Sequence, residues 1–305
     1  MSDRADGSHQ RLRADLLLLL VAVIWGNAFV AQRVAADHVG PFLFNGVRFL
    51  VGGVALAPAV GRRWGGLNRR EVIGGGLAGV VLFAAAVLQQ AGMAFTTAGK
   101  AGFITGLYVV LVPLFLAVGW RAWSHWSIWI AAALAVVGLF LLSEGTRFLA
   151  LAPGDGLVLA GAVMWASHVI LIGRLADRVD PVRLAVVQYL ACGLLSGAVG
   201  LIVEPQTISG LESAWWTVLY TGLLSIGLGY TLQVVAQRWT PAADAAVILS
   251  GESVFAAFWG WLLLGETLTG RQLVGCGLMF TAMVLAQVPQ ALKARAERRS
   301  VSGVE

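Results

Sequence analysis

Charged residues are scarce in this chain. Only 12% of its 305 residues are Asp, Glu, Lys or Arg, about half the share that a soluble domain carries. Cysteine is scarcer still, with Cys192 and Cys276 far apart in apolar runs and no CxxC pair. A disulfide framework is therefore excluded, and so is a cysteine-based metal site.

The motifs of several enzyme classes are also missing. The sequence has no HExxH, no GxxxxGK[ST] loop and no GxSxG turn, so it lacks the usual zinc-hydrolase, ATP-binding and serine-hydrolase signatures. Its four histidines are scattered along the chain, at His9, His38, His125 and His168. We therefore expect no metal, no cofactor and no enzymatic activity, and any transport would be powered by a gradient or run downhill.

Apolar residues dominate instead. They make up 58% of the chain, and the mean hydropathy is +0.81. A helix needs about 20 mostly apolar residues to cross a bilayer, and lipid admits only helices or closed barrels. Ten runs have this length and lack the alternation of strands: 15–35, 41–60, 72–95, 100–119, 126–143, 155–174, 181–203, 214–237, 241–264 and 271–289. The fold expected is an all-α integral membrane protein with ten transmembrane helices.

The chain contains an internal duplication. Residues 15–53 and 155–193 match at 13 of 39 positions without a gap, and the matches include Trp25 with Trp165 and Pro41 with Pro181. A shift of 144 residues relates the later parts, placing Gln89 on Gln233. We predict two five-helix repeats, at 15–147 and 153–290, between tails at 1–14 and 291–305. Because five is odd, the second repeat enters the membrane from the opposite side, which is a recurrent plan of secondary transporters.

Positive charge predicts the orientation. Sixteen of the 21 Lys and Arg residues fall on the side of the two termini, and cytoplasmic loops carry such an excess. Both termini are therefore expected in the cytoplasm. The basic tails are explained by this topology, so we expect no nucleic-acid partner.

Two tryptophans occupy matched positions deep in the membrane. Trp25 lies ten residues past Asp15, about 15 Å deep at 1.5 Å per residue, and Trp165 is equally deep from the other side. They are expected to form an aromatic cavity wall, or else to pack between the repeats with bonded indole N–H groups. Asn27 and Ser167 follow at matched positions as polar groups that need a partner.

An acid, an arginine and a histidine lie well inside predicted helices, at Glu252, Arg48 and His168. Glu252 lies near the bilayer centre, where a charge costs about 2.5–3.5 kcal/mol, so it is expected to bind a substrate ammonium group or to relay a proton. The alternative is a structural role, either as a partner of Arg48 or His168 or as a protonated acid bonded to the backbone. Arg48 is expected to extend outward to the interface. His168 shares the face of Trp165 and is a second candidate for proton coupling.

Other polar groups complete the expected site. Tyr108 and Tyr230 are polar groups inside helices, as is Gln233, whereas Gln89 is expected near the outer end of its helix in contact with water. Pro113 removes a backbone hydrogen bond and should kink the fourth helix as a hinge. The predicted cavity residues are Trp25, Asn27, Tyr108, Trp165, Ser167, Tyr230 and Glu252.

Several motifs resemble the EamA branch of the drug/metabolite transporter superfamily. They are a WGxxF motif at Trp25–Phe29, an LxVVLxP motif at Leu107–Pro113, and the stretch GESVFAAFWGWLLLGE that ends at Glu266. The resemblance covers about residues 12–290. Two departures are Arg121, where many relatives end the fourth helix with Gly-Glu, and Ser253, where relatives often have proline.

The resemblance implies an inner-membrane carrier with a central cavity, in a family made up mostly of exporters of amino acids and other small metabolites. We predict a multi-pass secondary transporter that exports small metabolites such as aromatic or hydrophobic amino acids by alternating access. Its expected partners are the lipid bilayer and a small-molecule substrate, and the expected state is a monomer or weak homodimer. An intramembrane enzyme and a structural or sensory membrane protein are the alternatives.

Overall fold

Every regular element in the described part of the chain is helical. The computed structural model describes residues 2–96, 98–142, 153–204, 208–264, 268–286 and 288. Eight helices are long and apolar enough to cross a membrane, and two shorter apolar helices, Trp126–Leu142 and Gly270–Ala286, join them. The prediction of an all-α chain is confirmed over these residues, and the ten apolar stretches fall on the ten predicted runs.

The first repeat contains six α-helices and one short 3₁₀ turn. They are α1 (Ser2–Ala36), α2 (Pro41–Val60), η1 (Gly61–Gly66), α3 (Arg69–Met93), α4 (Ala98–Gly106), α5 (Tyr108–Trp120) and α6 (Trp126–Leu142). Helix α1 begins well before the predicted apolar run, so most of the N-terminal tail is helical.

The second repeat follows the same plan. Its elements are α7 (Asp155–Leu175), α8 (Pro181–Val203), α9 (Ile208–Ser213), α10 (Trp215–Leu219), the π-helical segment η3 (Tyr220–Tyr230), α11 (Thr231–Ala236), α12 (Ala242–Leu249), α13 (Glu252–Leu264) and α14 (Gly270–Ala286). The tail at 291–305, the ends of both predicted repeats and the Gly265–Glu266 pair lie outside the described residues.

Helix starts follow from local chemistry. Pro41 and Pro181 occupy the first turns of α2 and α8, where the missing N–H costs nothing. The Asp180 carboxylate accepts hydrogen bonds from two backbone N–H groups of α8. Helix α2 has Gly40 at that position, and the distant Glu204 supplies the carboxylate instead, accepting from the first-turn backbone of α2 at 2.9 and 2.7 Å. Glu204 therefore ties the end of α8 to the start of α2.

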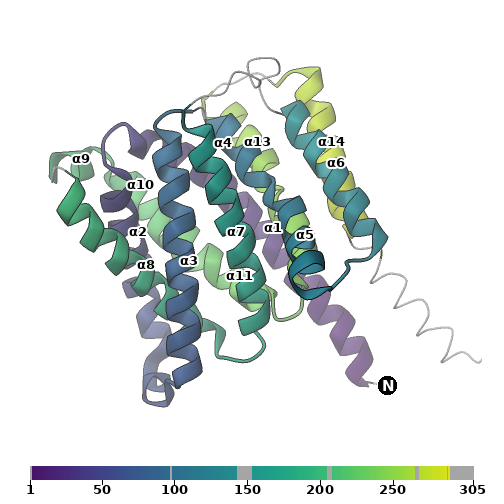
Figure 1. The fold of residues 1–305 in the computed structure, drawn as a ribbon, viewed down its shortest axis with the longest axis horizontal. Helices are drawn as coiled ribbons and strands as arrows, with labels where there is room; N and C mark the ends of the chain where they lie inside the picture. The colour runs from purple at the N-terminus through teal and green to yellow at the C-terminus, as the bar shows by residue number, and fades with distance from the viewer. Residues whose placement is uncertain are drawn as a thin grey trace, which may run out of the picture.

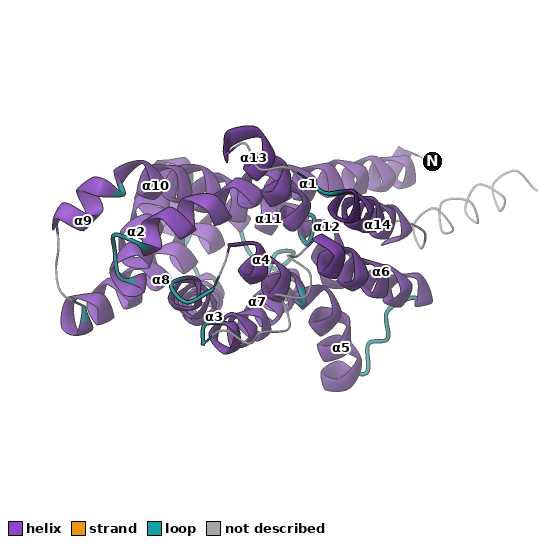
Figure 2. Ribbon diagram, turned by 90° about the horizontal axis from the view of Figure 1, so that it is seen from above, coloured by secondary structure: helices purple, strands orange, loops and turns teal. Residues whose placement is uncertain are grey.

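Small residues allow the helices to pack closely. A Cβ at Gly46 of α2 would lie 2.8 Å from the backbone of Gly197 in α8, and one at Gly138 of α6 would lie 2.7 Å from the carbonyl of Gly275 in α14. Figure 1 shows α6 beside α14 at one edge of the bundle and α2 with α8 towards the other. Figure 2 shows the remaining long helices between these pairs. Close approach through small residues is the usual basis of helix packing in lipid.

Contacts recur between the two repeats. Thr240 donates to Asp15 at 2.8 Å, and Thr96, its mate at a shift of 144 residues, donates to Asp155 at 2.9 Å. The fourth span is interrupted at Leu107, between α4 and α5, and the ninth at Ser250–Gly251, between α12 and α13. A shift of 144 places Leu107 on Gly251, so both repeats break at the same position.

Candidate functional site

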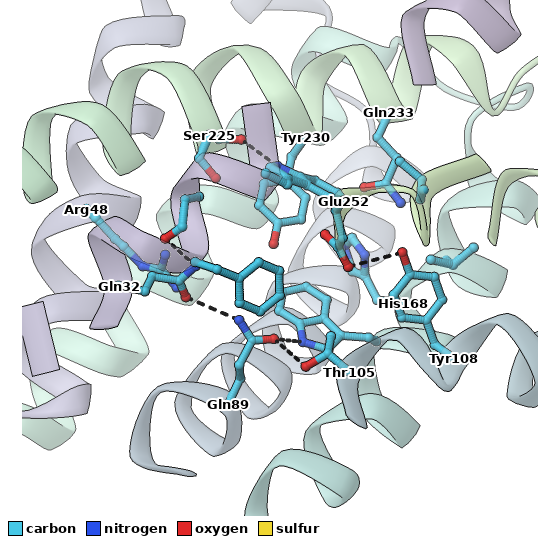
Figure 3. Close-up of a pocket in the computed structure, with 16 residues that line it drawn as sticks. Gln32, Arg48, Gln89, Thr105, Tyr108, His168, Ser225, Tyr230, Gln233 and Glu252 are labelled. Atoms are coloured by element: carbon cyan, nitrogen blue, oxygen red, sulfur yellow. Dashed lines mark hydrogen bonds between the residues drawn. The ribbon is translucent and has the colours of Figure 1, made fainter. Parts of the chain in front are cut away.

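A cavity lies at the centre of the bundle, between helices of both repeats. Its volume is about 40 Å³, which is room for one or a few water molecules and too little for an amino acid. The structure therefore shows a state in which the central cavity is too small to hold a substrate of that size. The lining residues, drawn in Figure 3, are Trp25, Ala28, Phe29, Gln32, Arg48, Gln89, Thr105, Tyr108, Trp165, His168, Val169, Ser225, Tyr230, Gln233, Leu249 and Glu252.

The two repeat-matched tryptophans both contact one tyrosine. The ring centroid of Tyr230 lies 4.5 Å from that of Trp25 and 5.9 Å from that of Trp165, with the latter pair stacked. Each indole N–H is bonded, from Trp25 to the carbonyl of Ser225 at 3.1 Å and from Trp165 to Gln89 Oε1 at 2.8 Å. The tryptophans were expected either to form a cavity wall or to pack with bonded N–H groups. Both indoles do both, since each has a bonded N–H group and lines the cavity.

The π-helical segment places part of this wall. Ser225 and Tyr230 both belong to η3, an 11-residue stretch that follows α10. Such stretches are rare and occur often at functional sites.

Glu252 and Tyr108 meet at the point where both broken spans resume. Each is the first residue of its helix, α13 and α5, and each is the mate of the other at a shift of 144 residues. The Tyr108 hydroxyl donates to Glu252 Oε1 at 3.3 Å. This is the only hydrogen bond of the Glu252 carboxylate to a described residue, although the side chain is 96% buried. Neither Arg48 nor His168 pairs with Glu252, so Glu252 is not a structural partner of either residue.

His168 presents one ring nitrogen without a protein partner. Its Nε2 lies 2.9 Å from Gln188 Oε1. Its Nδ1 has no hydrogen-bond partner among the described residues. The residue is fully buried and lines the cavity beside Trp165. An imidazole nitrogen without a described partner therefore lies in the same cavity as the Glu252 carboxylate.

The expectation that Arg48 extends outward is wrong. Its side chain is 97% buried and lines the cavity. Asn45 accepts a hydrogen bond from its Nε at 2.8 Å, and the guanidinium lies over the rings of Phe44 and Phe49 at 5.0 and 5.2 Å. These contacts hold the cation inward, and none of the described carboxylates pairs with it. Figure 3 shows Arg48 and Glu252 on opposite sides of the cavity.

Two residues of the predicted set lie outside the cavity. Asn27 and Ser167 each come two residues after a cavity tryptophan, and two helical residues turn the side chain by about 200°. Ser167 donates to the carbonyl of Val163 one turn earlier and faces the outside of α7. Counting residues along the helix puts Asn27 and Ser167 close to the cavity tryptophans along the axis, but it does not give the helix face on which they lie.

Several cavity residues escaped sequence reasoning. Gln89, expected near water, is buried and accepts from Trp165 and Thr105 while donating to Gln32. Its repeat match with Gln233, which also lines the cavity, was the signal that could have identified it.

Pro113, the predicted hinge, lies within α5, six residues after the interruption at Leu107.

An ion-pair network joins α1 to α12 near the N-terminal end of α1. Arg11 bonds both oxygens of Asp15 at 2.9 and 3.0 Å, Asp244 at 2.7 Å and the carbonyl of Trp239 at 3.1 Å. These charged side chains are about nine-tenths buried. The network holds the two repeats together at that end of the bundle.

Comparison with known proteins gives consistent matches. The model of the EamA-like transporter family matches twice, over residues 12–144 and 152–287. An uncharacterized transporter of Archaeoglobus fulgidus is 31% identical over 92% of this chain and 87% of its own length. The threonine/homoserine exporter RhtA of Salmonella typhimurium is 31% identical over 56% of both chains. The uncharacterized inner membrane transporter YedA of Escherichia coli is 24% identical over 90% of both.

One solved structure has the same fold. It superposes with a TM-score of 0.73 over 90% of this chain and 98% of its own, at 20% sequence identity. The family matches span nearly the whole chain, the relatives are named transporters, and the described helices are apolar enough to cross a membrane. The chain is a multi-pass inner-membrane protein and belongs to the EamA-like transporter family of the drug/metabolite transporter superfamily.

Proposed function

We propose that this protein is a secondary carrier that exports small zwitterionic amino acids with apolar side chains by alternating access. The observation that carries the proposal is that a basic and an acidic side chain line one aromatic cavity without pairing with each other. These are Arg48 and Glu252, and Figure 3 shows Tyr230 between them. A guanidinium is suited to a substrate carboxylate, and a carboxylate to a substrate ammonium group.

Different residues of the cavity would bind the ammonium group, the carboxylate and the apolar side chain of the substrate. Glu252 would accept hydrogen bonds from the ammonium group, and the free Nδ1 of His168 offers a second acceptor in the same cavity. Arg48 would bind the substrate carboxylate, since none of the described acids satisfies its charge. Trp25 and Trp165 would contact an apolar side chain. Glu252 and His168 are also the groups that would take up a proton when the substrate leaves.

Transport requires the cavity to enlarge, because its present volume of about 40 Å³ cannot hold an amino acid. The interruptions at Leu107 and Gly251 are the natural bending points, with Pro113 as a further hinge in α5. Movement there would separate Tyr108 from Glu252 and free the carboxylate for substrate. In this proposal each repeat opens one side of the membrane in turn.

The proposed topology follows the positive charge. Both termini lie in the cytoplasm, so the Arg11 network closes the cytoplasmic end of the bundle. The carrier works as a monomer or weak homodimer, with no nucleic-acid partner and no catalysed reaction. The name of RhtA, a threonine/homoserine exporter, supports an amino-acid substrate and export as the direction.

The test is exchange in liposomes that contain only this protein. Vesicles are loaded with one unlabelled metabolite from a panel, and uptake of labelled phenylalanine or tryptophan is followed. We expect exchange for apolar amino acids. The variants Glu252→Gln and Arg48→Gln should each lower the rate about 10- to 100-fold, because a hydrogen bond to a charged group contributes about 1.5–3 kcal/mol.

Asp37→Asn is the matched control, since Asp37 is an exposed carboxylate just after the end of α1 and its partner Arg33 lies in the last turn of that helix. It should exchange at the wild-type rate. Wild-type rates in both Glu252→Gln and Arg48→Gln would refute the assigned roles. Exchange of another panel member in place of every apolar amino acid would refute the substrate class and keep the carrier.

A further inference from the structure

A second cavity opens on the outside of the bundle, between α5 and α7. Its volume is about 350 Å³, several times that of the central cavity. It is lined by Phe115, Val118, Gly119, Trp120, Ser167, Ile170, Leu171 and Arg174. The four lining residues of α7 lie on the face of that helix that is turned away from Trp165 and His168. The outer groove is thus separate from the transport site.

The groove faces the surrounding lipid. Val118 and Trp120 on one wall are 76% and 52% exposed, although both belong to an apolar span. Figure 2 shows α5 at the margin of the bundle. The groove ends where two apolar spans end, at Trp120 and Leu175. Because an apolar span ends where the hydrocarbon layer ends, we place this end of the groove at the depth of lipid headgroups. Apolar side chains line most of its length.

One cation stands at that end. The Arg174 guanidinium lies 3.7 Å from the centre of the Trp120 ring, and it has no hydrogen bond or ion pair with any described residue. Stacking leaves the N–H groups in the plane of the guanidinium free to donate. A guanidinium binds phosphate through two parallel hydrogen bonds, and basic pockets between transmembrane helices bind anionic headgroups.

We propose that this groove binds an anionic phospholipid, with an acyl chain along α5 and α7 and the phosphate on Arg174. The apolar lining matches the acyl chain, and the unpaired cation at the headgroup level matches the phosphate. A zwitterionic lipid would bind less well, because its own ammonium group lies close to Arg174. The groove thus selects the lipid by headgroup charge.

The matching position in the other repeat is filled by protein. The mate of Phe115 at a shift of 144 residues is Trp259 of α13, whose indole donates to the carbonyl of Val23 in α1 at 3.2 Å. Gly26 lets α13 approach α1 so closely that a Cβ there would lie 2.6 Å from Phe255, whereas its mate in α7 is Ala166. The groove therefore belongs to one repeat alone, and we predict one lipid per chain.

Native mass spectrometry of the detergent-purified protein tests this with two probes, phosphatidylglycerol and phosphatidylcholine. The wild type should retain one phosphatidylglycerol and at least fivefold less phosphatidylcholine. Arg174→Gln should lower phosphatidylglycerol retention at least fivefold. Arg178→Gln is the matched control, because this exposed arginine lies one turn further on beside Asp177 and should leave retention unchanged.

A second variant tests the acyl-chain site without changing charge. Nothing lies within 4 Å of a Cβ at Gly119, so Gly119→Leu fits the fold and fills the groove. It should reduce phosphatidylglycerol retention as Arg174→Gln does, while circular dichroism shows unchanged helicity. Equal retention of the two lipids by the wild type would overturn the proposal. So would equal losses in Arg174→Gln and Arg178→Gln, or full retention in Gly119→Leu.

Discussion

Two Arg–Asp pairs with the same spacing involve α1, one within the helix and one at its C-terminal end, where Asp37 is the first residue after Ala36. They should differ sharply in their effect on stability. Arg11 and Asp15 have side chains that are 11% and 10% exposed, whereas Arg33 and Asp37 are 39% and 62% exposed. Replacing Arg11 by Gln removes the guanidinium that pairs with the buried carboxylates of Asp15 and Asp244. Breaking a buried pair in this way costs about 3–5 kcal/mol.

The exposed pair should contribute little. Replacing Arg33 by Gln removes one ion pair whose partners are largely exposed, and such pairs contribute about 0–1 kcal/mol. Because both changes are Arg→Gln on the same helix, propensity and side-chain size are matched. Asp244→Asn should cost less than Arg11→Gln, since Arg11 keeps its contact with Asp15.

The assay is the thermal unfolding midpoint of each purified variant in one detergent, followed by loss of near-ultraviolet circular dichroism. We expect Arg11→Gln to have the lowest midpoint and Asp244→Asn an intermediate one. Arg33→Gln should have the midpoint of the wild type. Added salt should change the midpoint of the wild type little, because screening acts on exposed pairs. Equal effects of Arg11→Gln and Arg33→Gln would refute the assignment of a buried network to this end of the bundle.

Four further substitutions test the packing at and around the central cavity. Gly26→Val should lower the unfolding midpoint and the exchange rate, because its Cβ would lie 2.6 Å from a side-chain atom of α13 and overpacking costs about 1–3 kcal/mol. Gly76→Val, which has open space around it, should change neither quantity. Trp165→Phe removes the bond to Gln89 and should cost about 0.6–1.7 kcal/mol in the unfolding free energy, with slower exchange. Ser167→Ala should keep the exchange rate within about twofold, since its hydroxyl bonds only its own helix.

The positions of the helices along the chain could be predicted from the sequence, but the face of each helix that is turned towards the cavity could not. Hydropathy located all ten apolar stretches, because a span must be long and apolar whatever it packs against. Depth counting placed Trp25, Trp165 and Glu252 at the cavity. The same counting also selected Asn27 and Ser167, since distance along a helix axis says nothing of the face on which a side chain lies.

Tertiary contacts decided the remaining differences. Arg48 points inward because Asn45 bonds its Nε and two phenylalanine rings flank the guanidinium. The meeting of Tyr108 and Glu252 was implicit in the shift of 144 residues, since an inverted repeat can bring matched positions together at its axis. The π-helical turn of η3, which positions Ser225 and Tyr230, has no proline or other local sign in the sequence.

In the proposed carrier, Arg48 binds the carboxylate of an amino acid and Glu252 binds the ammonium group of the same molecule. The most direct test is competition against labelled phenylalanine exchange in liposomes, with phenethylamine, which lacks the carboxylate, and 3-phenylpropionate, which lacks the ammonium group. We expect unlabelled phenylalanine to compete strongly and each analogue at least tenfold more weakly, as the loss of one charged contact requires. Competition by either analogue as strong as that by phenylalanine would contradict recognition at both ends of the cavity.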